Sequence, residues 1–92
     1  MIKSFKSKRT RALFEGERVK EFEAIRKVAF RKLDMVDTAA RLTDLRKPPN
    51  NRLEALKGSR KGQHSIRIND RWRVCFVWRG GHAHDVEIVD YH

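Results

Sequence analysis

The chain has 92 residues, 39% of them hydrophobic and 37% charged, and its formal net charge is +10. This length allows one modest core, so we expect residues 1–92 to form a single domain. No stretch approaches the roughly 18–20 apolar residues that cross a bilayer, and residues 1–6 lack the apolar core of a secretory signal. We therefore expect a cytoplasmic protein with no membrane partner. The positive charge favours nucleic acid or an acidic protein as the partner.

The N-terminal half predicts a short strand and two helices. Residues 2–5 are typical of a weak strand, and Ser7 can cap a helix over 8–15 that ends before a glycine. Apolar residues then recur every three or four positions from Phe22 to Ala40, which predicts one amphipathic helix over 20–41.

A turn at 43–45 and the two prolines within 47–51 interrupt regular structure. Residues 52–62 combine basic side chains with glycines, so we expect a flexible cationic loop there, attached to the core by Leu53 and Leu56. The rest of the chain predicts a meander of three strands over 63–68, 71–79 and 84–89, with tight turns between them. The predicted fold class is therefore α+β, with two helices preceding a small antiparallel sheet that residues 2–5 could join.

The alternation within 71–79 predicts how this sheet is oriented. Trp72, Val74 and Phe76 fall on one side, which the helices should cover, and Arg73 falls on the other with Arg67 of the preceding strand. The single cysteine, Cys75, cannot form an internal disulfide. We expect it to be a small buried residue in a protein of a reducing compartment.

The triplet Asp90-Tyr91-His92 directly follows the last predicted strand. It places a carboxylate, a phenol and an imidazole beside a rigid element in a basic chain, which suggests a metal-free site for a phosphodiester. RNA can be cut at such a site because its 2′-hydroxyl is an internal nucleophile. The protein must then supply a base, an acid and cations for the charge that builds on the phosphate.

Candidate proton-transfer groups are Asp90, His92 and Glu54, and Tyr91 could bond the phosphate or stack on a base. The candidate phosphate-binding cations are Lys57, Arg60, Lys61, Arg67 and Arg73. An arginine among them can donate two parallel hydrogen bonds to one phosphate. Each has a structural alternative: the triplet could be a polar tail, Arg73 a solvated sheet residue, and Glu54 an ion-pair partner of Arg52 or Lys57.

Metal and cofactor sites have little support in the sequence. The four histidines form no spaced ligand motif, and one cysteine cannot build a thiolate zinc site. The only paired glycines join two predicted strands, so they form no phosphate-binding loop at a helix start. We therefore expect no metal and no cofactor.

Three segments, residues 51–58, 63–76 and 86–92, together resemble the HigB toxins of the RelE/ParE superfamily of bacterial toxin–antitoxin systems. The resemblance extends to the opening residues 1–5. It implies a RelE-like fold, with two N-terminal helices packed on an antiparallel sheet, and a ribosome-dependent endoribonuclease that cleaves translated mRNA in the ribosomal A site. It also implies a HigA-like helix-turn-helix antitoxin as inhibitor, with operator DNA contacted only through the antitoxin complex.

The family's terminal Asp-Tyr-His falls on Asp90, Tyr91 and His92, its loop lysine on Lys57, and its sheet arginines on Arg67 and Arg73. One position departs, since a branch of the family has His where this chain has Glu54. Glu54 could act as the base, or Asp90 and His92 could carry the acid–base work alone.

Two other functions are compatible with the sequence. A ParE-like gyrase inhibitor would share the fold without needing the terminal triplet as proton-transfer groups, because fold alone does not determine function. A basic RNA-binding module without catalysis would bind in a steeply salt-dependent, sequence-indifferent manner.

Overall fold

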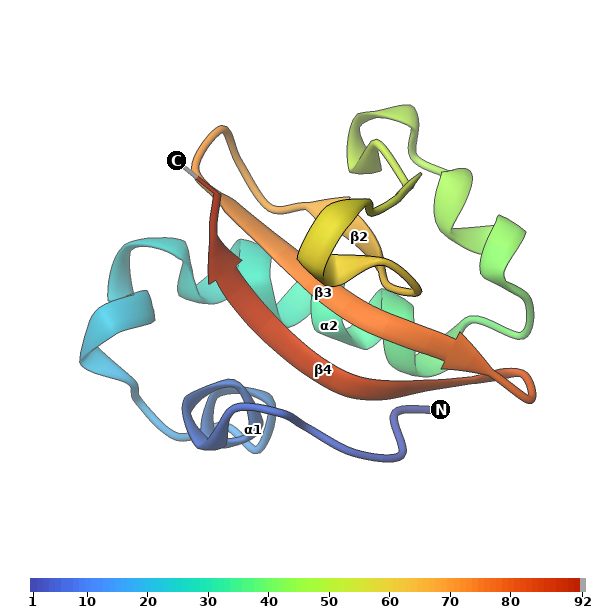
Figure 1. Cartoon of the computed structure of the whole chain (residues 1–92). Helices are drawn as coiled ribbons and strands as arrows, with labels where there is room; N and C mark the ends of the chain where they lie inside the picture. The colour runs from blue at the N-terminus through green and yellow to red at the C-terminus, as the bar shows by residue number, and fades with distance from the viewer. Residues whose placement is uncertain (92) are drawn as a thin grey trace.

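The computed structural model describes residues 1–91 and shows an α+β fold. Four antiparallel strands form one sheet in the order β1-β2-β3-β4. Two α-helices precede the sheet in the chain, and α2 runs behind it in Figure 1. The elements are α1 (Lys8–Phe14), α2 (Arg26–Thr38), β1 (Glu54–Ala55), β2 (His64–Arg67), β3 (Trp72–Arg79) and β4 (His82–Asp90). The predicted fold class and antiparallel sheet are confirmed.

Helix α1 begins where its capping residue predicts. The hydroxyl of Ser7 accepts a hydrogen bond from the backbone N–H of Thr10 at 3.2 Å, which satisfies one of the free donors at the helix start. Gly16 follows the helix with φ of 90°, a conformation that favours glycine. The buried hydroxyl of Thr10 accepts from the N–H of Ile88 at 3.0 Å and so ties α1 to β4.

The prediction of one helix over 20–41 is wrong at both ends. Residues Lys20–Ile25 form a 3₁₀ helix, and the α-helix begins only at Arg26. Phe22 and Ile25 are both buried, and a 3₁₀ turn places residues three apart on the same side, so this geometry brings both to the core. The ring of Phe22 meets Trp72 edge-on, with ring centroids 5.5 Å apart.

The C-terminal end of α2 is set by local hydrogen bonds that apolar spacing does not reveal. Ala39 is extended, and the N–H groups of Ala40 and Arg41 donate to the carboxylate of Asp44 at 3.0 and 2.9 Å. A 3₁₀ helix over Leu42–Arg46 follows at the predicted turn. The apolar pattern therefore continues through residue 40 although the helix ends at Thr38.

The core lies between the helices and one face of the sheet. Val74 and Phe76 are fully buried there, and Trp72 packs against the same cluster, as predicted. Leu33 and Val36 of α2 are also fully buried. Burial of large apolar side chains of this kind contributes roughly 1.5–3 kcal/mol each.

Two predicted segments pair differently from expectation. Residues 2–5 run parallel to β4 as two isolated bridges, between Ile2 and Ala83 and between Phe5 and Val86, instead of forming a strand. The loop expected over 52–62 is partly ordered into the sheet, because Glu54–Ala55 pairs with β2 as its edge neighbour. The flexible-loop prediction is wrong there because the backbone of β2 offers hydrogen-bonding groups with which the segment pairs. Leu56 is buried and Leu53 packs against the core, as predicted.

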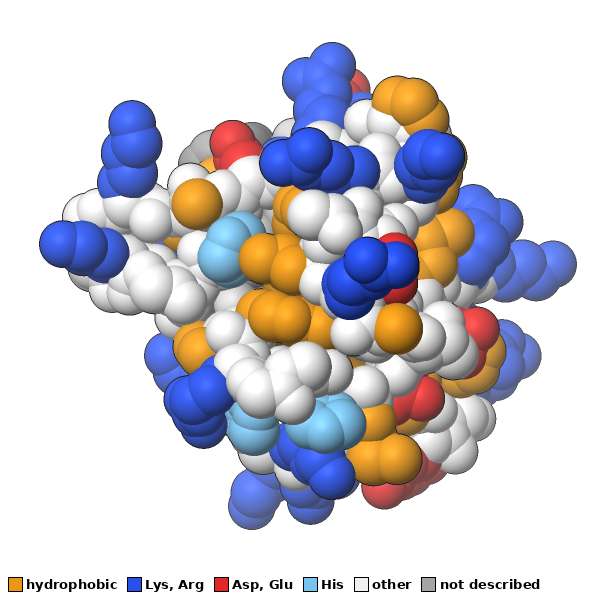
Figure 2. Space-filling model, turned by 90° about the vertical axis from the view of Figure 1, so that its right-hand side faces the viewer, with side chains coloured by type: hydrophobic (Ala, Val, Ile, Leu, Met, Phe, Trp, Pro, Cys, Tyr) orange, Lys and Arg blue, Asp and Glu red, His pale blue; other side chains and the backbone are white. Residues whose placement is uncertain are grey.

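Basic side chains dominate the surface. Figure 2 shows one side of the molecule, on which Lys and Arg side chains project along the outline and cover more of the surface than Asp and Glu side chains do. This distribution follows from 22 Lys and Arg against 12 Asp and Glu in the sequence. Such a surface attracts polyanions over a range of about 8 Å at physiological salt.

Candidate active site

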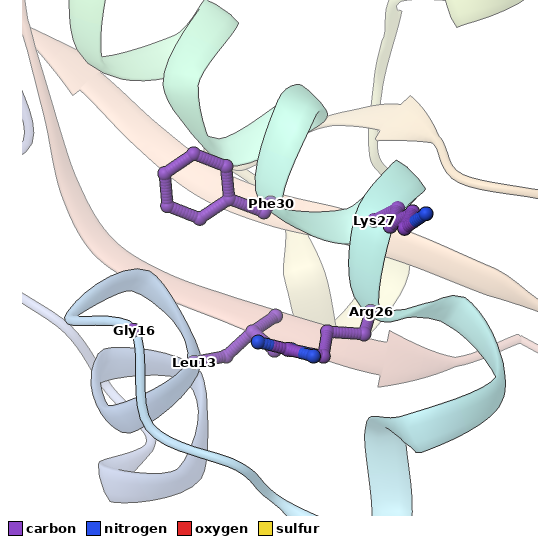
Figure 3. Close-up of a pocket in the computed structure, with 5 residues that line it drawn as sticks. All are labelled: Leu13, Gly16, Arg26, Lys27 and Phe30. Atoms are coloured by element: carbon purple, nitrogen blue, oxygen red, sulfur yellow. The ribbon is translucent and has the colours of Figure 1, made fainter.

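The helix side of the molecule carries a groove with little chemistry. It lies between α1 and α2, has a volume of about 380 Å³, and is lined by Leu13, Gly16, Arg26, Lys27 and Phe30 (Figure 3). These residues offer apolar surface and two cations but no carboxylate or imidazole. Because acid–base chemistry needs a group that accepts a proton, the groove is not a candidate active site.

The opposite face of the sheet, here called the outer face, carries the polar side chains of β2 and β3. Ser65 of β2 is in register with Cys75 of β3, and Arg67 is in register with Arg73. Alternate residues of a strand point to opposite faces, so these positions point away from Val74 and Phe76 and from the helices. The predicted placement of Arg67 and Arg73 on neighbouring strands of this face is confirmed.

Arg73 is held at the centre of the outer face by three groups. Its Nε donates to the hydroxyl of Ser65 at 2.8 Å, and its Nη2 donates to the backbone carbonyl of Arg52 at 2.8 Å. The same Nη2 lies 3.3 Å from Oε1 of Glu54. Only 12% of the side chain is exposed. A guanidinium fixed in this way is preorganised to stabilise negative charge without reorganising during a reaction.

Glu54 brings an accessible carboxylate to this guanidinium. Its side chain is 53% exposed, and it stands on the edge strand β1 beside Arg73. The guanidinium of Arg73 also lies over the ring of Tyr91, 5.6 Å from the ring centroid. We call Arg73, Glu54, Ser65 and Tyr91 the Arg73 cluster. It combines a fixed cation, a carboxylate and a phenol from β1, β2, β3 and the residue that follows β4.

A second ion pair lies beside the Arg73 cluster. Arg60 donates from Nη1 to Glu87 at 3.0 Å and to the side-chain oxygen of Gln63 at 3.1 Å. The hydrogen bond from Glu87 raises the pKa of Arg60 above its usual value. Cys75 is in register with Glu87 and fully buried, and burial raises the pKa of its thiol to about 11. The predicted RNA-binding residue Arg60 is thus already paired with a carboxylate.

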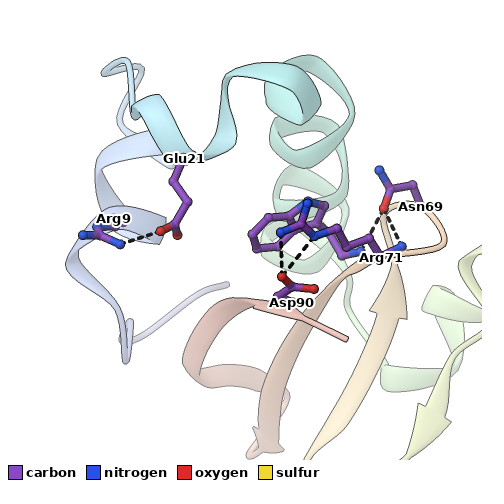
Figure 4. Close-up of polar contacts among 6 residues, drawn as sticks. Arg9, Glu21, Asn69, Arg71 and Asp90 are labelled. Carbon is purple, nitrogen blue, oxygen red and sulfur yellow. Dashed lines mark hydrogen bonds and ion pairs between the residues drawn. The ribbon is translucent and has the colours of Figure 1, made fainter. Parts of the chain in front are cut away.

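Asp90 and Tyr91, the two described residues of the terminal triplet, lie on different faces of the sheet. Asp90 is in register with Trp72, on the side of the helices, whereas Tyr91 reaches the Arg73 cluster. Both Nε and Nη2 of Arg71 donate to Oδ2 of Asp90, at 3.0 and 2.8 Å (Figure 4). This hydrogen bond raises the pKa of Arg71. The structure therefore brings Glu54, Arg73 and Tyr91 together and places Asp90 with Arg71.

The other predicted basic residues do not belong to the Arg73 cluster. Lys57 and Lys61 are exposed on either side of the 3₁₀ turn Gly58–Arg60. Arg67 contacts the carboxylate of Asp70. His92, the last member of the predicted triplet, lies outside the described residues.

Two groups that position Arg73 were not singled out from the sequence. Ser65 alternates with the inward-facing Ile66, and this pattern could have placed it on the same face as Arg73, diagonally across from it on the neighbouring strand. The carbonyl of Arg52 had no comparable signal. It depends on the left-handed backbone at that residue, with φ of 47° and ψ of 56°.

Two features of residues 1–91 bear on ligands and membranes. No group of three or more His, Cys, Asp or Glu residues lies close enough together to hold a metal ion. In the same part of the chain, no helix is long and apolar enough to cross a membrane.

Comparison with known proteins places the chain in a family. Residues 3–92 match the model of the RelE-like toxin of the type II toxin–antitoxin system HigB. Toxin HigB-1 of Vibrio cholerae is 39% identical over 85 residues, which are 90% of each protein. Endoribonuclease HigB of Proteus vulgaris is 34% identical over 97 aligned positions that cover both proteins in full.

The fold is also shared with a solved structure. One chain of the YoeB–YefM complex from Staphylococcus aureus superposes with a TM-score of 0.59 at 19% identity, over 100% of this chain and 95% of that one. At this identity the likeness concerns the fold alone. Together with the family model and the two relatives, it leads to one conclusion: the chain belongs to the HigB family of RelE-like toxins of type II toxin–antitoxin systems.

Proposed function

We propose that this toxin is a ribosome-dependent endoribonuclease that cleaves translated mRNA in the A site and so inhibits translation. The observation that carries the proposal is the Arg73 cluster, in which a fixed guanidinium stands 3.3 Å from an accessible carboxylate. The relative from Proteus vulgaris, named Endoribonuclease HigB, supports the same activity.

In the proposed reaction, the carboxylate of Glu54 accepts the proton of the 2′-hydroxyl. The 2′-oxygen then attacks the phosphorus and the bond to the 5′-oxygen breaks, which leaves a 2′,3′-cyclic phosphate and a 5′-hydroxyl. Arg73 stabilises the charge on the non-bridging oxygens, because its guanidinium is already oriented by Ser65 and the carbonyl of Arg52. The protein and the RNA therefore supply every group that this step needs.

The leaving 5′-oxygen needs a proton, and the terminal triplet supplies the candidates. Tyr91 lies against Arg73, where its phenol can bond the phosphate or its ring can stack on a base. Asp90 and His92 remain the acid–base candidates implied by the family motif. Asp90 pairs with Arg71 on the helix side of the sheet, so it would reach the Arg73 cluster only if this exposed, weak pair broke and the backbone at the end of β4 rotated.

The proposed partners follow from this role. The family consists of toxins that are paired with antitoxins. We propose a HigA-like helix-turn-helix antitoxin for this chain, with operator DNA bound only through the toxin–antitoxin complex. Lys57 and Lys61, which are exposed, and Arg67, which pairs with Asp70, would contact mRNA or ribosomal RNA in the cytoplasm. Arg60 would do so only by leaving Glu87.

The decisive experiment compares cleavage of one mRNA by the purified toxin with and without translating 70S ribosomes. We expect cuts within A-site codons only when ribosomes are present, with cyclic phosphate ends. Intact transcripts, together with inhibited gyrase supercoiling in a parallel assay, would replace the proposal with a gyrase inhibitor. Salt-dependent RNA binding without any cleavage would reduce the protein to an RNA-binding module.

A further inference from the structure

We infer that Lys32 and Asn51 are positioning residues for Arg73. They hold the turn that presents the carbonyl of Arg52 to the guanidinium, although neither residue is on the outer face. The expected change in kcat rests on the proposed function, whereas the positioning of Arg73 by Lys32 and Asn51 can be tested without any activity.

The first link is a buried polar pair between α2 and the segment before β1. Lys32 is only 5% exposed, and its Nζ donates to Oδ1 of Asn51 at 2.5 Å. Burial, with the neighbouring charges of Arg31 and Arg67, lowers the pKa of Lys32. A buried ammonium is unfavourable unless it is bonded, so the amide oxygen of Asn51 is its compensating partner.

The second link is the amide nitrogen of Asn51. This residue is fully buried, and its Nδ2 donates to the backbone carbonyls of Leu45 and Lys47, each at 3.2 Å. The side chain thus connects α2 to the backbone on the N-terminal side of the turn Pro49–Asn51. A fully buried amide with both ends engaged allows one orientation, because any other leaves polar groups unpaired.

The third link is the residue after Asn51. Arg52 has φ of 47°, in the left-handed region, which a residue with a side chain adopts only when its surroundings impose it. Its N–H donates to the carbonyl of Pro49 at 3.1 Å, and its own carbonyl accepts from Nη2 of Arg73 at 2.8 Å. The anchored turn therefore aims one of the hydrogen-bond acceptors that orient Arg73.

The role predicts a specific kinetic effect. Without the anchor, Arg73 keeps Ser65 at Nε and Glu54 near Nη2, but the carbonyl of Arg52 no longer has a fixed position at Nη2. The guanidinium then spends less time in the reactive orientation, so kcat falls about tenfold while KM for programmed ribosomes stays unchanged. A residue that merely stabilised the fold would instead lower the amount of folded protein and leave the kcat of the folded fraction intact.

The test uses Lys32→Met in the full chain, because Met retains the apolar stem and removes the ammonium. Lys27→Met is the matched control, since Lys27 is on the same helix and exposed. The readouts are kcat, KM and the exchange rate of the Arg73 Nε–H and Nη–H protons by NMR. We expect the lower kcat and at least fivefold faster exchange of the Nη–H protons in Lys32→Met, with wild-type values in Lys27→Met.

A double variant links the effect to Arg73. In an Arg73→Lys background, Lys32→Met should cause no further loss of kcat, because the group through which it acts is already gone. A full additional tenfold loss in that background would overturn the inference, and so would unchanged exchange of the Arg73 protons. If wild-type toxin does not cleave mRNA, the proposed function fails, and the NMR comparison alone decides the inference.

A second variant covers the case in which Lys32→Met does not fold. Asn51→Asp keeps an oxygen for Lys32 and removes the two donations to Leu45 and Lys47. We expect the same faster exchange at Arg73 and the same loss of kcat. Exchange and kcat equal to those of wild type would show that the turn holds Arg52 without Asn51.

Discussion

The two faces of the four-stranded sheet are stabilised in opposite ways. The helix side is a continuous apolar core that includes Val74 and Phe76 of β3. On the outer face, the polar side chains are anchored by hydrogen bonds and ion pairs, with Arg73 bound to Ser65, Arg52 and Glu54. Alternation along one strand therefore separates stability from chemistry, and each face can change without directly repacking the other.

This separation has one exception, which is instructive. The outer face has its own fully buried residues, Ser65 and Cys75, beneath the arginines. The long side chains of Arg60 and Arg73 cover them while keeping their charged ends near the surface. The outer face is thus a thin polar layer over two small buried residues. Packing against them holds these arginines more firmly than if their side chains were surrounded by solvent.

The largest effect should come from truncating the helix side. Phe76→Ala removes a fully buried ring that packs against Trp78, and we expect it to cost about 3–5 kcal/mol of unfolding free energy in urea titrations. Val77→Ala, one residue on and partly exposed, should cost less than about 1 kcal/mol. Equal losses for both variants would contradict the division between the faces.

The next largest effect should appear at the outer face, in activity. Arg73→Ala should lower the single-turnover cleavage rate by about 10–1000-fold, because it removes a preorganised donor from the developing charge. Arg79→Ala, at the exposed end of the same strand, is the matched control and should cleave normally. Weaker binding to ribosomes with a normal single-turnover rate would assign Arg73 to substrate positioning only.

Glu54→Gln tests which carboxylate serves as the base. We expect single-turnover cleavage to fall by about 100-fold, because the amide does not accept the 2′-hydroxyl proton effectively. Glu23→Gln, an exposed carboxylate paired with Arg18, should leave the rate unchanged. If Glu54→Gln cleaves at the wild-type rate and Asp90→Asn does not, the acid–base work belongs to the terminal triplet.

The smallest effect concerns Cys75, one of the two buried residues of the outer face. The thiol of Cys75 has its pKa raised to about 11 from 9.0, so above pH 9 the unfolded chain ionises while the folded chain stays neutral. The contribution of Cys75 to stability is therefore complete below pH 9 and is lost as the pH rises toward 11. Its size is at most about 3 kcal/mol, since one pKa unit corresponds to about 1.4 kcal/mol.

The measurement is urea unfolding of wild-type protein and Cys75→Ala on both sides of pH 9. The stability difference between the two should shift in favour of Cys75→Ala at the higher pH. A difference that does not depend on pH would mean that the thiol ionises as easily in the folded protein as in the unfolded chain.

Some features of the fold depend on short-range patterns, and these could be predicted. Strand alternation placed Trp72, Val74 and Phe76 on the helix side and Arg73 on the other, because side-chain direction in a strand has a period of two. The N-cap at Ser7 and the antiparallel sheet follow from equally local rules. The helix over 20–41 was mispredicted because the three-residue step from Phe22 to Ile25 suits both 3₁₀ and α geometry, so the spacing alone does not locate the boundary at Arg26.

By itself, the sequence determined the fold class, the two faces of β3 and the residue types available for chemistry, since these depend on composition and on periods of a few residues. Only the tertiary structure decided which of those residues meet. It joined Glu54 to Arg73 through a strand that had seemed to be a loop, and it separated Asp90 from Tyr91 across the sheet. It also placed Asn51 and Arg52 behind the arginine. These contacts join residues that are distant in the sequence. Local sequence patterns do not predict them, because each contact depends on where whole elements pack and on which backbone groups remain to be hydrogen-bonded.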